Sequence, residues 1–275
     1  MEALTEREWN QANTITEKEE MLRQESIPPN EHDQFFELPP AVQAHQSVTE
    51  QAVEQAAFAQ SFGDTQGPDK VSFGAVHLLW ELERARIVVL AKAVVLTGRH
   101  PTGWKRASGV VTCTAGTDDY TKPKVYRFIS LLSCMGNVVE KVVAELLAEE
   151  AERRGLLSNS KYGSTKRRSA IDPAAIVVER AHAAGREDHI TGIHLMDIKT
   201  AFPSIGRGRL IHTMIGKGMD GDLIRWMASV LTDETVEMLI AGNVMERHPV
   251  EPGIPQSSPV SPILIAICTS GLMNN

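Results

Sequence analysis

The chain is poor in cysteine and has no long run of apolar residues. Its three cysteines, Cys113, Cys134 and Cys268, lie far apart and form no Cys-x-x-Cys pair, so neither a disulfide framework nor a zinc site is indicated. This usage fits a reducing compartment inside the cell, the cytoplasm or the nucleus. The N-terminus is charged from Glu2 onward, which argues against a secretory signal, and no apolar run reaches the roughly 18 residues that span a bilayer. We therefore expect a soluble intracellular protein without a membrane partner.

The signatures of common hydrolases and of phosphate-binding loops are also missing. The nine histidines include no His-x-x-x-His pair with an adjacent glutamate, so a zinc hydrolase is not expected. Ser257 and Ser258 stand outside any Gly-x-Ser-x-Gly elbow, and no glycine-rich phosphate loop occurs. The formal net charge is -7, so the surface is not basic everywhere. A nucleic-acid site must then be a local basic patch.

One stretch of the chain fits such a patch. Residues 153–168 carry several Lys and Arg side chains and no acidic residue. They are the best candidate for contact with a phosphate backbone, and a solvated helix end followed by a loop explains them equally well. The six basic side chains of this patch are Arg153, Arg154, Lys161, Lys166, Arg167 and Arg168.

The N-terminal half of the chain is predicted to be helical after a polar lead-in. With 275 residues, 42% of them hydrophobic, the chain can hold one large domain or two small ones. Residues 1–64 are polar and read as a weakly packed lead-in, with a charged helix over residues 6–24. Residues 66–70 form a turn, and apolar residues at helical spacing over 76–95 predict one or two buried helices. The spaced positions there are Leu79, Leu82, Ile87, Leu90 and Val94.

Further along, helices alternate with candidate strands. A helix over 137–154 pairs Lys141 with Glu145 and Glu149 with Arg153 on its polar face, and it stops at Gly155. Its apolar face consists of Val138, Val139, Val142, Val143, Leu146 and Leu147.

The second half of the chain contains two more helices and a hairpin. A helix begins at Asp172-Pro173 and runs to about Gly185, and another is capped by Asp220. Residues 191–196 are predicted to form a strand, and residues 236–248 a hairpin. The fold class expected from this order is α+β, rich in helix on its N-terminal side.

The predicted strand ends at a carboxylate that could hold a metal. Phosphoryl transfer to a growing nucleic acid uses two divalent metals, and Mg²⁺ prefers oxygen ligands. Asp197 follows the strand, the carbonyl of Ile198 could add an oxygen, and Phe202 could wall the sugar side of a nucleotide. A strand that ends in Asp is more often a cap or loop anchor, so this segment alone does not establish a catalytic site.

Several segments, taken in order, resemble the reverse transcriptases encoded by non-LTR retrotransposons. Residues 126–132, Tyr-Arg-Phe-Ile-Ser-Leu-Leu, are similar to the family's Tyr-Arg-Pro-Ile-Ser-Leu block, and residues 161–170 resemble its Gln-Phe-Gly-Phe-Arg…Arg-Ser block. Residues 194–205 resemble the block of the first catalytic Asp, and residues 253–262 the Pro-Gln-Gly-Ser-Pro block. Gly-Pro-Asp at 67–69 matches an upstream turn. The joint order is far more specific than any single segment.

This resemblance implies a right-hand polymerase fold, here the fingers and an incomplete palm. Residues 65–104 would form a helical extension of the fingers, and residues 105–275 a partial reverse transcriptase domain. The implied activity is RNA-templated DNA synthesis with Mg²⁺, an RNA template, a DNA primer and deoxynucleoside triphosphates.

The resemblance also assigns roles to single residues. Asp197 and the carbonyl of Ile198 would bind the metals, Arg127 the triphosphate, Phe202 would exclude a 2′-hydroxyl, and Gln256 would line the nucleotide and template pocket. Structural alternatives remain open. Arg127 can equally be a surface arginine, Phe202 a core residue and Gln256 a helix cap.

Departures from the family pattern weaken the expected site. Residues 111–116 lack the family's phosphate-binding lysine, Phe128 replaces a proline, and Lys161-Tyr162 replaces Gln-Phe. Ser257 stands where the family has glycine, so we expect a distorted pocket loop.

The family's aromatic-x-Asp-Asp block does not occur after Pro262, and Asp118-Asp119 is expected in a finger loop. We therefore predict that the 275-residue chain alone is inactive. The strand predicted over residues 191–196 would lack a neighbouring strand, so we also expect poor solubility. The competing hypothesis is a non-catalytic helical module that binds nucleic acid or protein. A third possibility is a part of a longer, active reading frame.

Overall fold

Most of the chain from residue 48 onward is described in a computed structural model of the protein. The described ranges are 14, 17, 37–40, 48–60, 63, 66–113, 116, 126–158, 161–163, 168–169, 171–196, 198, 201–202, 204–240, 243–250, 253–255 and 257–270, with backbone alone at 113, 126–128 and 240.

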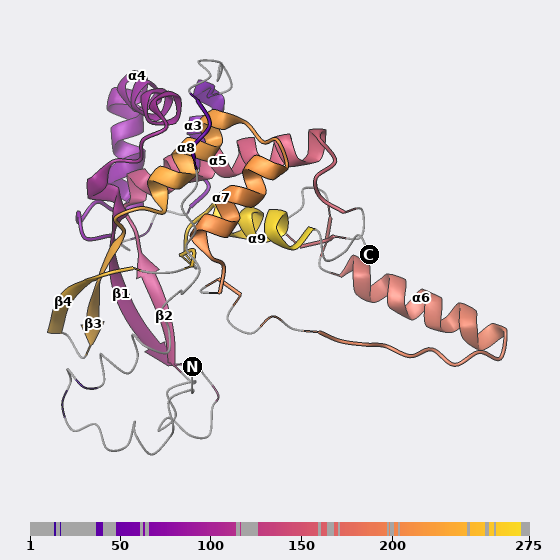
Figure 1. The fold of residues 1–275 in the computed structure, drawn as a ribbon. Helices are drawn as coiled ribbons and strands as arrows, with labels where there is room; N and C mark the ends of the chain where they lie inside the picture. The colour runs from indigo at the N-terminus through magenta and orange to yellow at the C-terminus, as the bar shows by residue number, and fades with distance from the viewer. Residues whose placement is uncertain are drawn as a thin grey trace.

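The described elements form a helical body, a sheet at one end of it and a projecting arm (Figure 1). The helices of the body are α3 (Glu50–Ala57), α4 (Phe73–Thr97), α5 (Cys134–Arg153), α7 (Arg207–Gly216), α8 (Gly221–Val230) and α9 (Ser261–Thr269). The strands are β1 (Arg106–Cys113), β2 (Tyr126–Leu131), β3 (Thr235–Ile240) and β4 (Asn243–Pro249), and a short 3-10 helix, Thr102–Lys105, precedes β1. The arm contains α6 (Asp172–Arg186).

The main core lies between the helices of the body. The apolar face predicted for α5 is buried there, with Val143 and Leu147 fully enclosed and Leu146 partly buried. Helix α8 adds Trp226 and Met227, and α9 adds Leu264. These elements bury apolar faces that none of them could shield alone, so the body depends on helix-to-helix packing.

The sheet has four strands in the order β2-β1-β3-β4. β1 pairs antiparallel with β2, in a register that places Val110 opposite Ile129, and parallel with β3. β3 and β4 form the predicted antiparallel hairpin, with an irregularity between Glu237 and Leu239. The sheet thus joins residues near 110 to residues near 240, and it holds the block at 126–131 beside the body.

Most of the predicted helices are confirmed. α5 covers the range expected near 137–154, with Lys141 and Glu145 paired at 3.3 Å and Gly155 in the left-handed region at φ +63°. α6 matches the helix predicted from Asp172. The side chain of Asp220 caps α8 by accepting from two backbone N–H groups, as expected. The mixed α and β content agrees with the expected fold class.

The apolar stripe predicted for residues 76–95 is partly wrong. Ile87 and Val94 are buried as expected, but Leu79 and Leu82 are 41% and 69% exposed, and Leu90 is also exposed. The cause is a break inside α4: Glu83 has φ -140° and ψ 29°, outside the helical region. Residues before and after the break therefore do not share one face, and the helical spacing cannot be carried across it.

The polar lead-in also differs from its prediction. Helix α3 packs on α4 and α5, and its Val53 and Ala57 are completely buried in the main core. Weak packing is therefore wrong for residues 48–57, where three apolar side chains on one face suffice to anchor a short helix. The helix expected over 6–24 lies almost entirely outside the described residues. The domain boundaries at 64 and 104 stay predictions.

The strand predicted at 191–196 is also wrong. This segment has no regular secondary structure, and Leu195 and Met196 are 87% and 86% exposed. It runs back beside α6, which has no buried residue, as a projecting arm (Figure 1). A strand needs a neighbour for its backbone N–H and C=O groups, and no described strand pairs with this segment.

Candidate nucleotide and template site

The segments that carry the motifs meet around one loop, residues 253–260, which we call the Pro-Ser loop. It leads directly into α9 and includes the undescribed position 256. The hydroxyl of Ser257 donates a hydrogen bond to the backbone carbonyl of Ser130, in the block that forms β2. The N–H of Ile254 donates to the carbonyl of Phe202 at 3.1 Å. The loop therefore contacts both the 126–132 block and the 194–205 block.

A buried arginine fixes the start of the Pro-Ser loop. Arg207, the first residue of α7, donates from Nε to the carbonyl of Gly253 at 3.0 Å and also to the carbonyl of Leu231. Its guanidinium pairs with the Glu234 carboxylate at 2.6 Å, and both side chains are buried. Burial raises the pKa of Glu234 to about 7, although the charges of Arg207 and Lys105 act in the opposite direction. Because a buried guanidinium is costly without acceptors, Arg207 depends on Glu234 and on the two backbone carbonyls.

A lysine of the 161–170 block binds the helix that follows the loop. The ammonium group of Lys161 donates to the carbonyl of Ala266 at 3.0 Å and to the hydroxyl of Thr269, both in the last turn of α9. Carbonyls at the end of a helix have no partner within it, and they carry partial negative charge. The replacement of the family's Gln by Lys161 thus places a cation where α9 can use it.

Ser257 does not strain the loop in the way that its sequence predicts. Its backbone is not among the described residues with positive φ, whereas Gly253 has φ +90°. The backbone at Ser257 therefore does not adopt the left-handed conformation in which a Cβ would be strained, and the expected distortion is not found there. The serine instead gains a hydroxyl that bonds Ser130.

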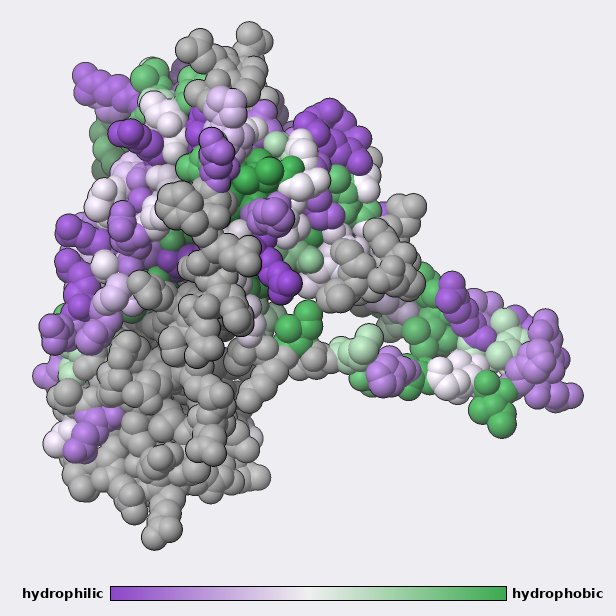
Figure 2. Space-filling view, in the orientation of Figure 1, coloured by the Kyte–Doolittle hydropathy of each residue, from purple (hydrophilic) through white to green (hydrophobic). Residues whose placement is uncertain are grey.

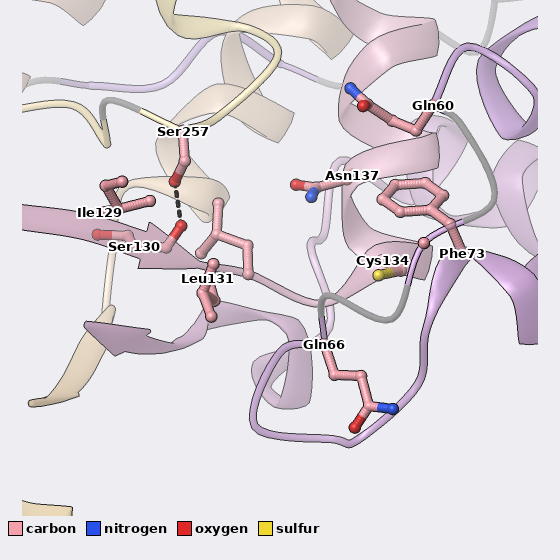
Figure 3. A pocket seen from close by; sticks show the side chains of 11 residues that line it. Gln60, Gln66, Phe73, Ile129, Ser130, Leu131, Cys134, Asn137 and Ser257 are labelled. Carbon is pink, nitrogen blue, oxygen red and sulfur yellow. Dashed lines mark hydrogen bonds between the residues drawn. The ribbon is translucent and has the colours of Figure 1, made fainter. Parts of the chain in front are cut away.

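A hollow of about 260 Å³ lies beside this contact (Figure 3). Ser257 and Ser130 lie at one end of it, and Phe73, Cys134 and Asn137 lie at the other. None of its lining residues is charged, so the hollow does not suit a triphosphate. Burial is the main cause that raises the pKa of the Cys134 thiol, which keeps it protonated and unreactive.

Behind the loop lies a buried carboxylate that sequence reasoning missed. Glu140 on α5 is 3% exposed, and its Oε2 accepts a hydrogen bond from the Ser258 hydroxyl. Burial raises the pKa of Glu140 to about 8. His100 lies between the edges of Trp104 and Trp226, and burial lowers its pKa to about 4. The available signal was spacing, because Glu140 precedes Val143 and Leu147 by three and seven residues on the apolar face.

The described structure covers only some of the predicted site residues. Asp197 and Gln256 lie outside the described residues, and so does the side chain of Arg127. Ile198 is 50% exposed in the arm, and Phe202 is partly buried against the main core. The core contact fits the structural alternative for Phe202. The Asp118-Asp119 pair also lies outside the described residues.

The described residues do not fit a Mg²⁺ site. No three His, Cys, Asp or Glu side chains among them come together as metal ligands. The backbone on both sides of position 197 is exposed at Met196 and Ile198 and is paired with no described strand. A two-metal centre needs several oxygen ligands held close together, and the described residues alone do not supply such a set.

Four of the six residues of the basic patch are described, and three make contacts within the chain. Arg154 pairs with Glu150 at 2.9 Å and donates to the carbonyl of Gly218. Arg168 donates to the carbonyls of Ser158 and Lys161, and Lys161 binds α9 as described above. Arg153 is exposed, and positions 166 and 167 lie outside the described residues. Nucleic-acid contact by the patch stays a prediction.

Apolar side chains are exposed on the arm and on α4. Figure 2 shows green residues among purple ones along the projecting arm, where Ile193, Leu195 and Met196 are largely exposed. None of the described helices is long and apolar enough to pass through a membrane.

Comparison with known proteins identifies the family. The family model "Reverse transcriptase (RNA-dependent DNA polymerase)" matches residues 117–275, more than half of the chain. Three curated relatives come from Drosophila melanogaster. A probable RNA-directed DNA polymerase from transposon BS is 21% identical over 186 residues, covering 68% of this chain and 20% of the relative. The RNA-directed DNA polymerase from mobile element jockey is 22% identical over 207 residues, covering 75% and 22%.

The third relative is a probable RNA-directed DNA polymerase from transposon X-element, 21% identical over 215 residues, covering 78% of this chain and 24% of the relative. The chain thus spans about a fifth to a quarter of the length of these relatives. The family match covers all four sequence blocks, from residue 126 to residue 262, in the expected order. The chain belongs to the reverse transcriptase (RNA-dependent DNA polymerase) family.

Proposed function

We propose that this chain supplies the fingers and part of the palm of a polymerase that copies RNA into DNA. One observation carries the proposal: the Pro-Ser loop and α9 touch the other three blocks, through Ser130, Phe202 and Lys161. Residues far apart in the sequence thus converge on the loop that, in the family, lines the nucleotide pocket. The substrates would be an RNA template, a DNA primer and deoxynucleoside triphosphates.

Within this proposal, Arg127 would bind the triphosphate through its guanidinium, which has several N–H donors. Gln256 would line the pocket, and Phe202 would exclude a 2′-hydroxyl. Asp197 and the carbonyl of Ile198 would be the metal ligands of this part of the site. Because the described residues do not assemble a metal centre, no catalytic step is assigned to Mg²⁺ here.

We further propose that a polypeptide of these 275 residues alone does not polymerise DNA. Asp197 is the single carboxylate that the family resemblance assigns to the metals, and one carboxylate cannot hold the two metals that phosphoryl transfer requires. The test is primer extension on an RNA template with Mg²⁺, comparing the chain with Asp197→Ala and with an active reverse transcriptase. Neither form of this chain is expected to extend the primer. Extension by the unmodified chain that Asp197→Ala abolishes would contradict the proposal.

Nucleic-acid binding can be tested separately from catalysis. If the basic patch contacts phosphates, binding of a primer–template duplex should weaken steeply between about 50 mM and about 200 mM salt. The reason is that protein binding releases cations condensed on the nucleic acid, and this release is less favourable at high salt. Arg153→Gln should weaken binding, whereas Lys92→Gln, an exposed lysine on α4, should not. Fluorescence anisotropy measures both. Binding that is equally tight at both salt concentrations would exclude phosphate contact by the patch.

A further inference from the structure

The Pro-Ser loop is fastened to the fingers helix α5 by one buried pair. The Ser258 hydroxyl donates to Oε2 of Glu140 and accepts the N–H of Val260 at 3.3 Å. Ser258 is 3% exposed, so water does not compete for this bond. The hydroxyl therefore links α5 to the backbone just before α9.

The same short loop is held from other sides as well. The N–H of Ser258 donates to the Pro255 carbonyl at 3.3 Å, and the Ser261 hydroxyl donates to the same carbonyl at 2.6 Å. Arg207 holds Gly253 and the carbonyl of Phe202 holds Ile254, as described above. Contacts from α7 and from Phe202 thus hold the first two residues of the loop. Glu140 is the contact that reaches its centre from α5.

Each titratable group around Glu140 belongs to a different element. His100, from the segment after α4, places Nε2 3.8 Å from Oε1 of Glu140, beyond hydrogen-bond range. Glu234 precedes β3 and raises the pKa of Glu140 further by its charge, while Ser258 opposes the rise. Arg207 pairs with Glu234, and Lys105, before β1, lies near both His100 and Glu234. Among the described residues, no lysine or arginine forms an ion pair with Glu140, and its surroundings favour a neutral acid.

We propose that Glu140 is a positioning residue that sets the geometry of the Pro-Ser loop through Ser258, and with it the pocket face of the proposed polymerase site. A residue needed only for filling space in the core would tolerate an apolar side chain of similar length. Position 140 instead holds a carboxyl group in contact with a hydroxyl, at the cost of burying a polar group in the core. The inference rests on the proposed function only in one respect, namely that the Pro-Ser loop lines the nucleotide and template pocket.

Hydrogen exchange in the intact chain tests the proposal without any activity. The reporters are the loop amides of Ile254, Ser258 and Val260, and the amides of α8 report on the body. Glu140→Met removes the acceptor and should raise loop exchange about five- to tenfold, the effect of losing one hydrogen bond. Glu140→Gln keeps an acceptor oxygen without a charge and should restore protection to within about twofold.

A matched control lies on the same helix. Glu150 is also buried but accepts from the Asp220 N–H and pairs with Arg154, away from the loop. Glu150→Gln should leave loop exchange unchanged. If Glu140→Met fails to fold, Ser258→Ala removes the same bond from the other side and should give the same loss of loop protection.

A pH series adds a readout that simple packing would not change. Loop protection, corrected for intrinsic exchange, should fall in the unmodified chain as pH rises through about 8, because an ionised Glu140 draws in water. In Glu140→Gln it should stay flat. Equal loop protection in the unmodified chain and Ser258→Ala, or equal pH dependence in Glu140→Gln, would overturn the proposal. If a longer polypeptide that contains this chain and the rest of the polymerase failed to extend a primer, the proposed function would be overturned. The hydrogen-exchange result for Glu140 would still stand.

Discussion

At the residue scale, Gly67 is required by a close approach between two backbones. A Cβ at this position would lie 2.6 Å from the carbonyl oxygen of Leu132 and 2.9 Å from the N–H nitrogen of Ser133. Both atoms belong to the backbone just before α5, so neither can rotate away as a side chain would. The Gly-Pro-Asp turn thus rests directly on the end of the 126–132 block.

Gly67→Ala should therefore lower the free energy of unfolding by about 1–3 kcal/mol, the cost of forcing extra volume into a packed contact. Urea unfolding followed by circular dichroism measures the change. Gly103→Ala is the control, because a Cβ there meets no atom within 4 Å. Equal stability of the two variants would show that the turn can move away from Leu132.

At the element scale, α9 depends on a side chain from another block. Its first turn has no side-chain cap, and its last turn receives Lys161. Lys161→Met should cost about 1–2 kcal/mol, because it removes a charged donor from carbonyls in the last turn of the helix. Lys141→Met removes only an exposed i,i+4 pair with Glu145 and should change stability by about 0.5 kcal/mol or less. Chemical unfolding measures the free energy of unfolding of both variants. A larger loss of stability in Lys141→Met than in Lys161→Met would show that Lys161 does not stabilise α9.

The arm is the element that depends least on the body. It buries no residue of α6, and Ile193 and Leu195 are exposed in its return segment. Leu195→Lys should increase the monomer fraction of the purified chain, since it removes exposed apolar surface from an unpaired segment. Its melting temperature should stay the same. Thr191→Lys adds the same charge without removing apolar surface, and size-exclusion chromatography compares them. Equal gains would point to net charge instead of the apolar arm.

At the scale of the whole molecule, stability should depend on pH through three buried groups. The pKa of Glu140 is raised from 4.5 to about 8, and that of Glu234 from 4.5 to about 7. Each carboxyl therefore keeps its proton in the folded state and loses it in the unfolded state. The stability that each contributes is complete below about pH 4.5 and is lost as pH rises through the folded pKa. His100, lowered to about 4, acts in the opposite sense between about pH 4 and 6.5.

The unmodified chain should thus lose stability from about pH 4.5 to 8, by up to about 1.4 kcal/mol per pH unit for each carboxyl that is protonated only in the folded state. Up to about pH 6.5, His100 offsets the loss from one of the two carboxyls. Glu140→Gln should reduce this slope, most clearly between about pH 7 and 8 where Glu234 has already ionised. Melting temperatures across the range provide the measurement. A stability that rises steadily over the same interval would contradict the buried, protonated state of both carboxyls.

The sequence by itself determined the family and most of the elements. The order of the motif blocks, the apolar face of α5, the Asp220 cap and the β3–β4 hairpin are local patterns, and local backbone preferences act over a few residues. The residues near one turn or cap are neighbours in the chain, so their contacts follow from their spacing. This is why the helices expected over 137–154 and from Asp172 to about Gly185 appear in the structure, as α5 and α6.

Only the tertiary structure decided which faces are buried and which distant residues meet. The break at Glu83 changes the buried face of α4, and residues 191–196 lack a strand because no described neighbour pairs with them. The contacts of Glu140 with Ser258 and of Lys161 with α9 join positions more than a hundred residues apart. Such contacts depend on how the elements pack against one another. Local sequence patterns therefore do not show which distant residues will meet.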